Sequence, residues 1–505
     1  MNASNRIILN TLAQYARTII NMVLSLYSSR LVLEILGVED YGVYSLVAGV
    51  VSMLSFLTNS LVGSTQRFLS VSQGHGSIER LKQVFSNSLL LHIVLGLAIV
   101  IILASFTPWI FNGFLNIPIE RINAAEKLYL LVVLMVYVSF LASPYRALLV
   151  SHENIIYTSI IDVFDGILKV VLVMLLPYSS IDKILAYGFI MLGIQFFNLL
   201  AFLIYSHLTY EECIFPKIRL FSFTYIKELS SFTGWMLYSS ICITVRTQGL
   251  AVVLNKIYGA AINAAYGIGS QISGMVSFIS SSFNNAVAPQ LMAAEGGGER
   301  KRMLTLAMVQ SKTSFLLLAM IGIPTIFEMQ SLLELWLVDV PQNTMLFGRV
   351  FLSMQIVVML SIGLGTANKA IGNVGRYTLL TFTPKLLILP LAWYILTHNG
   401  SFRLLGIVMF AVEAICMLLR VYLFRKESWF DAFDYCVSVI LRSLVPVLIS
   451  CITCFIVQIL ISSDIRILYT YTSSITLFLL TSYIITLNRN ERIVVKSIIK
   501  KIFKR

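Results

Sequence analysis

The sequence has little charge. Asp, Glu, Lys and Arg make up 12% of its 505 residues, about half the share that is typical of a soluble domain. Several stretches carry no charged residue at all, and each is longer than the roughly 20 apolar residues that a helix needs to cross a bilayer. These stretches are residues 41–66, 83–119, 184–210, 257–294, 443–463 and 467–488. The composition therefore predicts a polytopic helical membrane protein rather than a set of soluble domains.

Three further absences narrow the class. The apolar runs do not alternate with polar residues in segments of about 10, which excludes a transmembrane β-barrel. The six cysteines form no paired pattern and the five histidines are scattered singly, so neither a disulfide framework nor a metal site is expected. No catalytic residues and no cofactor are implied. We also expect no cleaved signal peptide, because the first apolar stretch carries Arg17 and Arg30 and has no cleavage site.

Apolar runs separated by charges, Gly and Pro predict fourteen spans. Most of the 37 Lys and Arg fall between spans on the side that holds the N-terminus, so the positive-inside rule places both termini in the cytoplasm. The net charge is +13, and much of it lies in the tail 488–505. A basic amphipathic tail predicts contact with an anionic inner leaflet, not with nucleic acid. The predicted spans are 8–33, 41–63, 84–107, 126–150, 155–177, 184–208, 229–255, 260–286, 304–327, 345–368, 376–397, 402–424, 437–461 and 467–487.

An internal repeat relates the two halves of the chain. A shift of 222 residues aligns Gly37 to Tyr44 (GVEDYGVY) with Gly259 to Tyr266 (GAAINAAY), and the same register aligns Gly74 with Gly296. Two six-helix bundles in a parallel repeat about the membrane normal are predicted, an architecture that serves alternating access. The predicted parts are bundles at 1–212 and 229–434, a linker at 213–228, two added helices at 435–487, and the tail 488–505.

Polar residues recur inside several predicted spans. An ionisable group at bilayer depth costs about 2.5–3.5 kcal/mol, so it normally faces a partner or a hydrated cavity. The first span carries a stripe at three- and four-residue steps, which favours a hydrated cavity, and the eighth carries one that fits either a cavity or helix contacts. Arg146 and Lys369 end equivalent spans. The stripes are Asn10, Gln14, Arg17, Asn21, Ser25 and Ser28, and Asn263, Tyr266, Ser270, Ser273, Ser277, Ser281 and Asn284.

The segment LGVEDYGVYSLV, Leu36 to Val47, resembles the motif of polysaccharide transport proteins and Wzx-type flippases. Their superfamily also holds the multidrug-and-toxin extruders and the lipid II flippases. The resemblance implies a MATE-like fold and a flippase, not an enzyme, in the bacterial cytoplasmic membrane. Its substrate would be an undecaprenyl-diphosphate-linked oligosaccharide for O-antigen or capsule synthesis, and other polysaccharide-assembly proteins could be partners.

The candidate substrate-binding residues come from the polar stripes and the seventh span. They are Arg17, Asn21, Gln14, Arg246, Asn263 and Ser270. No acid lies one helical turn from Arg17 or Arg246, so both are expected to be uncompensated until an anionic ligand binds between the halves. Asp162, Asp165 and Lys169 share a face of the fifth span, with Asp165 and Lys169 in the favourable i,i+4 order. That face is either a coupling-ion site or a structural pair.

Two other functions stay open. A MATE-type multidrug or cation antiporter would need a deep acidic site, for which Asp162, Asp165 and Glu413 are the candidates. A membrane-embedded polymerase or glycosyltransferase could use Glu39 and Asp40 with a metal. The short outer loops favour a turn with an outward-facing charge at that pair instead.

Overall fold

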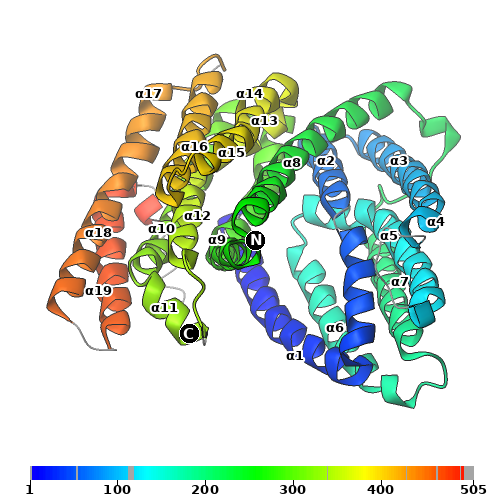
Figure 1. Cartoon of the computed structure of the whole chain (residues 1–505). Helices are drawn as coiled ribbons and strands as arrows, with labels where there is room; N and C mark the ends of the chain where they lie inside the picture. The colour runs from blue at the N-terminus through cyan, green and yellow to red at the C-terminus, as the bar shows by residue number, and fades with distance from the viewer. Residues whose placement is uncertain are drawn as a thin grey trace, which may run out of the picture. The chain divides into compact units, whose positions relative to one another are not determined.

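The computed structural model describes residues 3–52, 55–111, 119–337, 339–427, 429–461, 465–489 and 491–493. Every regular element in these residues is a helix, so the predicted all-helical class is confirmed. The chain folds into two compact units (Figure 1). Unit 1 holds residues 1–240 and 288–299, and unit 2 holds residues 241–287 and 300–505. The predicted domain boundaries stay predictions, and residues 494–505 of the predicted tail lie outside the described residues.

Unit 1 consists of the first helices of the chain and the beginning of α8. They are α1 (Ala3–Ser52), α2 (Ser55–Gly74), α3 (Ile78–Ser105), the short α4 (Thr107–Trp109), α5 (Ile122–Ser151), α6 (Ile155–Met174), α7 (Lys183–Thr209) and α8 (Phe223–Tyr258), with single 3-10 turns at Ile119–Arg121, Leu176–Tyr178 and Ile218–Leu220.

Unit 2 holds the end of α8, most of α9 and all later helices. These are α9 (Ala260–Gly296), α10 (Arg300–Phe327), α11 (Met329–Trp336), α12 (Thr344–Met359), α13 (Ile362–Ile371), α14 (Val374–Leu386), α15 (Ile388–Thr397), α16 (Phe402–Phe424), α17 (Ala432–Tyr435), α18 (Arg442–Leu460) and α19 (Arg466–Thr481). π-Helical segments lie at Cys436–Leu441 and Ser482–Thr486.

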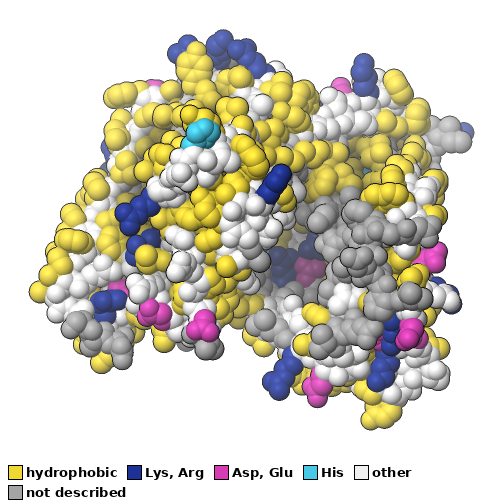
Figure 2. Space-filling model, in the orientation of Figure 1, with side chains coloured by type: hydrophobic (Ala, Val, Ile, Leu, Met, Phe, Trp, Pro, Cys, Tyr) yellow, Lys and Arg dark blue, Asp and Glu magenta, His cyan; other side chains and the backbone are white. Residues whose placement is uncertain are grey.

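Among the described residues, ten helices are long and apolar enough to cross a membrane, or eleven if the bent pair α12 and α13 forms one span. The protein is therefore a multi-pass membrane protein. Three of the fourteen predicted spans do not meet this measure: 41–63, 155–177 and 260–286. The last two correspond to α6 and α9: α6 carries three charged residues, Asp162, Asp165 and Lys169, and α9 is rich in polar Ser and Asn side chains. Hydrophobic side chains also cover much of the surface in view (Figure 2).

Glycines in left-handed backbone conformations mark equivalent points of the two halves. Gly37 interrupts α1 with φ 79°, and Gly259 separates α8 from α9 with φ 82°. Gly76 and Gly298, in the loops after α2 and α9, have φ 71° and 75°. Only glycine adopts such angles without strain. Both pairs are 222 residues apart, so the repeat seen in the sequence is also present in the backbone.

Tyr44 and Tyr266 also occupy corresponding places. Tyr44 packs against the apolar cluster of unit 1 that includes Leu128 and Tyr129 of α5. Tyr266 packs edge-on against Phe347 of α12, with ring centroids 5.7 Å apart. Both tyrosines thus pack on the helix that contains the fourth predicted span of their half, although the edge-on ring partner of Tyr44 is Tyr187 of α7, at 4.7 Å.

Two equivalent glycines meet inside unit 1. A Cβ atom on Gly74, at the end of α2, would lie 2.1 Å from the carbonyl oxygen of Ala293. A Cβ atom on Gly296, at the end of α9, would lie 1.9 Å from the carbonyl oxygen of Val71. The two helix ends therefore pack backbone to backbone, which no residue larger than glycine allows.

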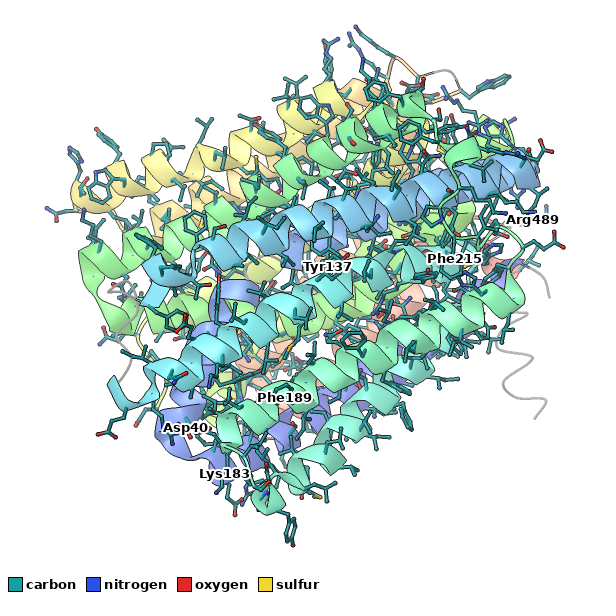
Figure 3. All side chains as sticks on the ribbon, turned by 90° about the vertical axis from the view of Figure 1, so that its right-hand side faces the viewer. Asp40, Tyr137, Lys183, Phe189, Phe215 and Arg489 are labelled. Atoms are coloured by element: carbon teal, nitrogen blue, oxygen red, sulfur yellow. The ribbon has the colours of Figure 1, made fainter. Side chains whose placement is uncertain are left out.

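The opposite end of unit 1 is held by a cluster around Arg121. Its guanidinium binds Asp40 at 3.0 Å and Asp182 at 2.8 Å, and thereby joins the kink of α1 to the start of α7. Figure 3 shows Asp40 and Lys183 at one end of unit 1 and Phe215 at the other. Asp40 is buried, so it serves as a structural ion-pair partner. The side chain of Glu39 is outside the described part of the chain.

The last two helices pack against α10 of unit 2 and lie side by side (Figure 1). Glu328, which follows α10, is fully buried and binds Arg466 of α19 at 3.1 Å and Thr470 at 2.9 Å. Lys312, nearer the start of α10, binds the carboxylate of Glu491 at 3.0 Å. The added helices are thus fixed to unit 2 by ion pairs at two levels of α10.

Candidate functional site

A charged cluster lies among α1, α5 and α6 of unit 1. One oxygen of Asp162, Oδ2, accepts a hydrogen bond from Arg17 of α1 at 2.7 Å. The same oxygen accepts a hydrogen bond from Arg146 of α5, also at 2.7 Å. We call these three residues the open cluster. Two consecutive helices, α5 and α6, and the distant α1 thus bring two guanidinium groups to one carboxylate.

The open cluster has excess positive charge and is accessible. Two cations share one anion, which leaves a net charge of +1. The side chains of Arg17, Asp162 and Arg146 are 21%, 18% and 39% exposed. In the described part of the chain, only Nη1 of Arg17 donates to Asp162. Its Nε and Nη2 can therefore donate to a second anion, and a guanidinium group binds phosphate through two such parallel bonds.

The rest of the polar stripe on α1 turns toward α6 and the loop before it. The side-chain amide of Asn10 donates to the carbonyl of Glu153 at 2.8 Å, and Gln14 is buried. Asn21 lies against α6, because a Cβ atom on Gly166 would be 3.1 Å from its Oδ1. The expectation of a hydrated cavity along the whole stripe is therefore wrong, since two of these side chains are buried within unit 1. Arg17 keeps partial exposure.

The other two candidates on α6 form no direct ion pair within the described residues. Lys169 acts on Asp165 electrostatically, and the side chain of Asn198 on α7 also faces that carboxyl group. Oδ1 of Asp165 is buried without a hydrogen bond. Asp162 is thus held directly by two arginines, whereas Arg146 and Asp162 act on Asp165 through space, as Lys169 does. A coupling-ion role for Asp162, Asp165 or Lys169 stays a prediction.

A second charged cluster lies in unit 2, among α8, α14 and α16. The carboxylate of Glu413 binds Lys385 at 2.7 and 2.9 Å and also binds Arg246. We call these three residues the closed cluster, because Glu413, Lys385 and Arg246 are only 2%, 5% and 11% exposed. Arg420, one further cation on α16, donates to Ser361 at 3.2 Å and acts electrostatically on Glu413.

The two arginines singled out from the sequence are therefore both paired. The expectation that Arg17 and Arg246 stay uncompensated is wrong, because each finds its carboxylate on another helix. Spacing along one helix cannot reveal such partners. A simple charge argument could have found them: an isolated acid inside an apolar span, such as Glu413, costs several kcal/mol unless a base from another span meets it.

The polar stripe on α9 has two parts. Toward its C-terminal end, Ser280 donates to the carbonyl of Ser314 at 2.8 Å, and the hydroxyl of Ser314 donates to Asn284 at 2.7 Å. This part serves contact between α9 and α10. Nearer the start of the helix, Asn263 is half-buried and Ser270 is exposed. Both candidates are thus accessible on unit 2, and their role in binding stays a prediction.

Comparison with known proteins adds a family and a fold. The family model described as polysaccharide biosynthesis protein matches residues 4–294, more than half of the chain. The chain is also 22% identical over 314 residues to the uncharacterized membrane protein EpsK of Bacillus subtilis. That alignment covers 62% of this chain and 61% of the relative, so the match spans about three fifths of either protein.

Solved structures of MATE and MOP superfamily proteins share the fold. A MATE protein in the bent conformation superposes with a TM-score of 0.74 at 14% identity, covering 84% of this chain and 95% of the other. An outward-facing multidrug resistance MATE family transporter gives 0.72 at 14%, covering 84% and 96%. A MOP superfamily transporter from Pyrococcus furiosus gives 0.72 at 13%, covering 86% and 97%. At these identities the likeness establishes the MATE-like fold.

Proposed function

This chain belongs to the polysaccharide biosynthesis protein family, and we propose that it is a transporter that carries a lipid-linked oligosaccharide diphosphate across the bilayer. The family and the fold together support a membrane transporter rather than an enzyme. The finer proposal, that the cargo has a diphosphate, is carried by one observation. The open cluster holds a net positive charge among membrane helices and keeps it accessible.

An anionic ligand satisfies the open cluster better than Asp162 does alone. Both arginines compete for a single carboxylate oxygen, so each guanidinium keeps unused donors. A diphosphate supplies several acceptor oxygens and more negative charge, and charge-assisted bonds of this kind are about twice as strong as neutral ones. On unit 2, the accessible Asn263 and Ser270 carry amide and hydroxyl groups of the kind that hydrogen-bond sugars. In this proposal the cargo moves from the inner to the outer leaflet of the bacterial cytoplasmic membrane.

The alternatives fit these contacts less well. A cation antiporter needs an acid free to bind a cation. Of its three candidate acids, Asp162 and Glu413 are each held by two cations, which leaves Asp165, whose Oδ1 has no hydrogen bond, as the acid for that alternative. A polymerase or glycosyltransferase that used Glu39 and Asp40 with a metal would need a free Asp40 carboxylate, but Arg121 already binds it. The charge balance therefore favours an anionic cargo.

Transport by purified protein tests this proposal. Protein in vesicles would be given a polyprenyl diphosphate with a fluorescent disaccharide, and an impermeant reductant would bleach the label in the outer leaflet. Arg17→Ala and Arg146→Ala should each slow transbilayer movement at least tenfold, because each removes half of the phosphate contacts. Arg30→Ala is the matched control, since Arg30 is an exposed arginine on the same helix. Normal transport by both cluster variants would refute the proposal.

A further inference from the structure

An apolar groove runs along the outside of unit 1 between α1 and α6. Its volume is about 390 Å³, within the range of small-molecule pockets. Arg17 provides the charged part of its wall, Ser159 the hydroxyl, and aliphatic or aromatic side chains the rest. These lining residues come from α1 and α6 alone.

The local sequence explains why a groove forms here. Ala13 and Ala16 are small and leave space on α1 where larger residues would fill it. The opposite wall is a row of exposed side chains on one face of α6, at steps of three and four residues: Ile156, Ile160, Phe164 and Ile167. Such a face contacts hydrocarbon in a membrane. These exposed side chains leave the groove open on the surface of unit 1.

Arg17 joins this groove to the open cluster. Its side chain lines the groove, while its Nη1 holds Asp162 at 2.7 Å. An apolar channel thus begins beside a site with a net charge of +1. A matching ligand has a long hydrocarbon chain attached to a strongly anionic head. A polyprenyl diphosphate has this structure, and it carries more negative charge than the single phosphodiester of a phospholipid.

We propose that the α1–α6 groove holds the prenyl chain of the transported lipid next to a diphosphate bound at Arg17. This inference rests on the proposed function and adds the location of the chain. It also makes Ala13 and Ala16 determinants of substrate recognition through their small size. The chain stays in contact with the bilayer while the head is bound by unit 1.

Photolabelling tests the occupant directly. The protein would be placed in phosphatidylcholine vesicles with a photoactivatable polyprenyl diphosphate, and labelled peptides of α1 and α6 would be quantified. Ala16→Phe should fill the groove and lower labelling at least tenfold. Ala98→Phe is the matched control, because Ala98 is an exposed alanine on α3, outside the groove. Ile160→Trp narrows the groove from the opposite wall and should give the same loss if Ala16→Phe does not fold.

A phospholipid probe separates the two sources of hydrocarbon. Unlabelled polyprenyl diphosphate should displace a photoactivatable phosphatidylglycerol from these peptides. If phosphatidylglycerol labels the groove and is not displaced, the groove is an ordinary lipid contact and the inference is overturned. Equal labelling by the diphosphate probe in wild type, Ala16→Phe and Ile160→Trp overturns it as well.

Chain length separates this inference from the proposed function. Wild type should transport a disaccharide on a long polyprenyl diphosphate at least tenfold faster than one on a short prenyl chain, and Ala16→Phe should abolish that difference. Equal transport of both lengths by wild type would overturn the groove and leave the transport proposal standing. If wild type transports neither substrate but labelling of the groove still depends on Ala16, the groove inference is supported and the transport proposal is overturned.

Discussion

The two charged clusters have the same ratio of cations to anions but differ in their exposure to solvent. Each consists of one carboxylate held by two cations, from three different helices. In unit 1 the acid is 18% exposed and the arginines 21% and 39%, whereas in unit 2 the acid is 2% exposed. Buried ion pairs resist exchange, because breaking one leaves a charge without compensation. In our proposal the open cluster exchanges Asp162 for an anionic ligand, whereas the closed cluster has a structural role.

The repeat makes the comparison sharper. The 222-residue shift pairs α1 with α8 and α6 with α14, and the first helix of each pair supplies an arginine. The second helix supplies the acid Asp162 in unit 1 but the base Lys385 in unit 2, where α16 supplies the acid instead. Both clusters thus pair two cations with one anion, but the acid lies on non-equivalent helices of the two repeats. Equivalent helices do not imply equivalent roles.

The largest expected effect is on the closed cluster. Glu413→Gln would leave Arg246 and Lys385 buried without their anion, which costs about 3–5 kcal/mol of unfolding free energy. Thermal unfolding in detergent should show a large fall in the midpoint. Glu427→Gln is the control, because its pair with Arg300 is about one-third exposed and contributes at most about 1 kcal/mol. Equal unfolding midpoints for the two variants would show that the closed cluster does not stabilise the fold more than an exposed ion pair does.

A smaller loss of stability is expected in the open cluster, together with a gain of binding. Asp162→Asn removes a carboxylate that is partly exposed, so the free energy of unfolding should fall by about 1 kcal/mol. It also removes the competitor for both arginines and raises the net charge of the cluster to +2. Polyprenyl diphosphate should then bind more tightly to the variant in nanodiscs. Weaker binding would mean that Asp162 positions the arginines rather than competing with the ligand.

Replacing the guanidinium while keeping its charge should have a more modest effect. Arg17→Lys retains the cation but loses the planar pair of donors that matches a phosphate. We expect transport between that of wild type and Arg17→Ala, measured with the same fluorescent substrate. Transport by Arg17→Lys at the wild-type rate would indicate that charge alone is recognised.

The smallest expected effect lies outside both clusters, in the loop after α7. Burial alone would raise the pKa of Glu212, but its hydrogen bonds to His152 and to its own backbone N–H, with the charge of Lys82, lower it below 4.5. A lowered pKa stabilises the fold fully above pH 4.5, and this stability is lost as the pH falls through the folded value. Glu212→Gln should lower the unfolding midpoint at neutral pH and make it less dependent on pH below 4.5. An unchanged acid dependence would contradict this.

Much of the fold could be predicted from the sequence because its signals are local. Charge-free runs identify apolar helices, and the glycines at 37, 76, 259 and 298 mark turns that require a left-handed backbone. The span count was less certain where polar residues interrupt the pattern, as in α6 and α9. The close contact of Gly74 with Gly296 is not a local property, although the repeat did align the two residues.

The candidate site could be predicted only in part. The sequence drew attention to Arg17, Arg246 and Asp162, since ionisable groups are costly in apolar spans. It could not pair Arg17 with Asp162, because those residues are 145 positions apart. It also missed Arg146 as a second ligand of that carboxylate and Lys385 as a partner of Glu413. Helix packing decides such pairs, and helix packing is not visible in a periodic pattern.

Binding of polyprenyl diphosphate to three proteins in nanodiscs tests most directly that the open cluster is the anion site and the closed cluster is not. Dissociation constants would be measured for wild type, Arg17→Ala and Arg246→Ala, each shown to be folded by its unfolding midpoint. Arg17→Ala should bind at least tenfold more weakly, a loss of about 1.4 kcal/mol, and Arg246→Ala should bind like wild type. Wild-type affinity in Arg17→Ala, with a loss in Arg246→Ala, would contradict the assignment and place the anion in unit 2.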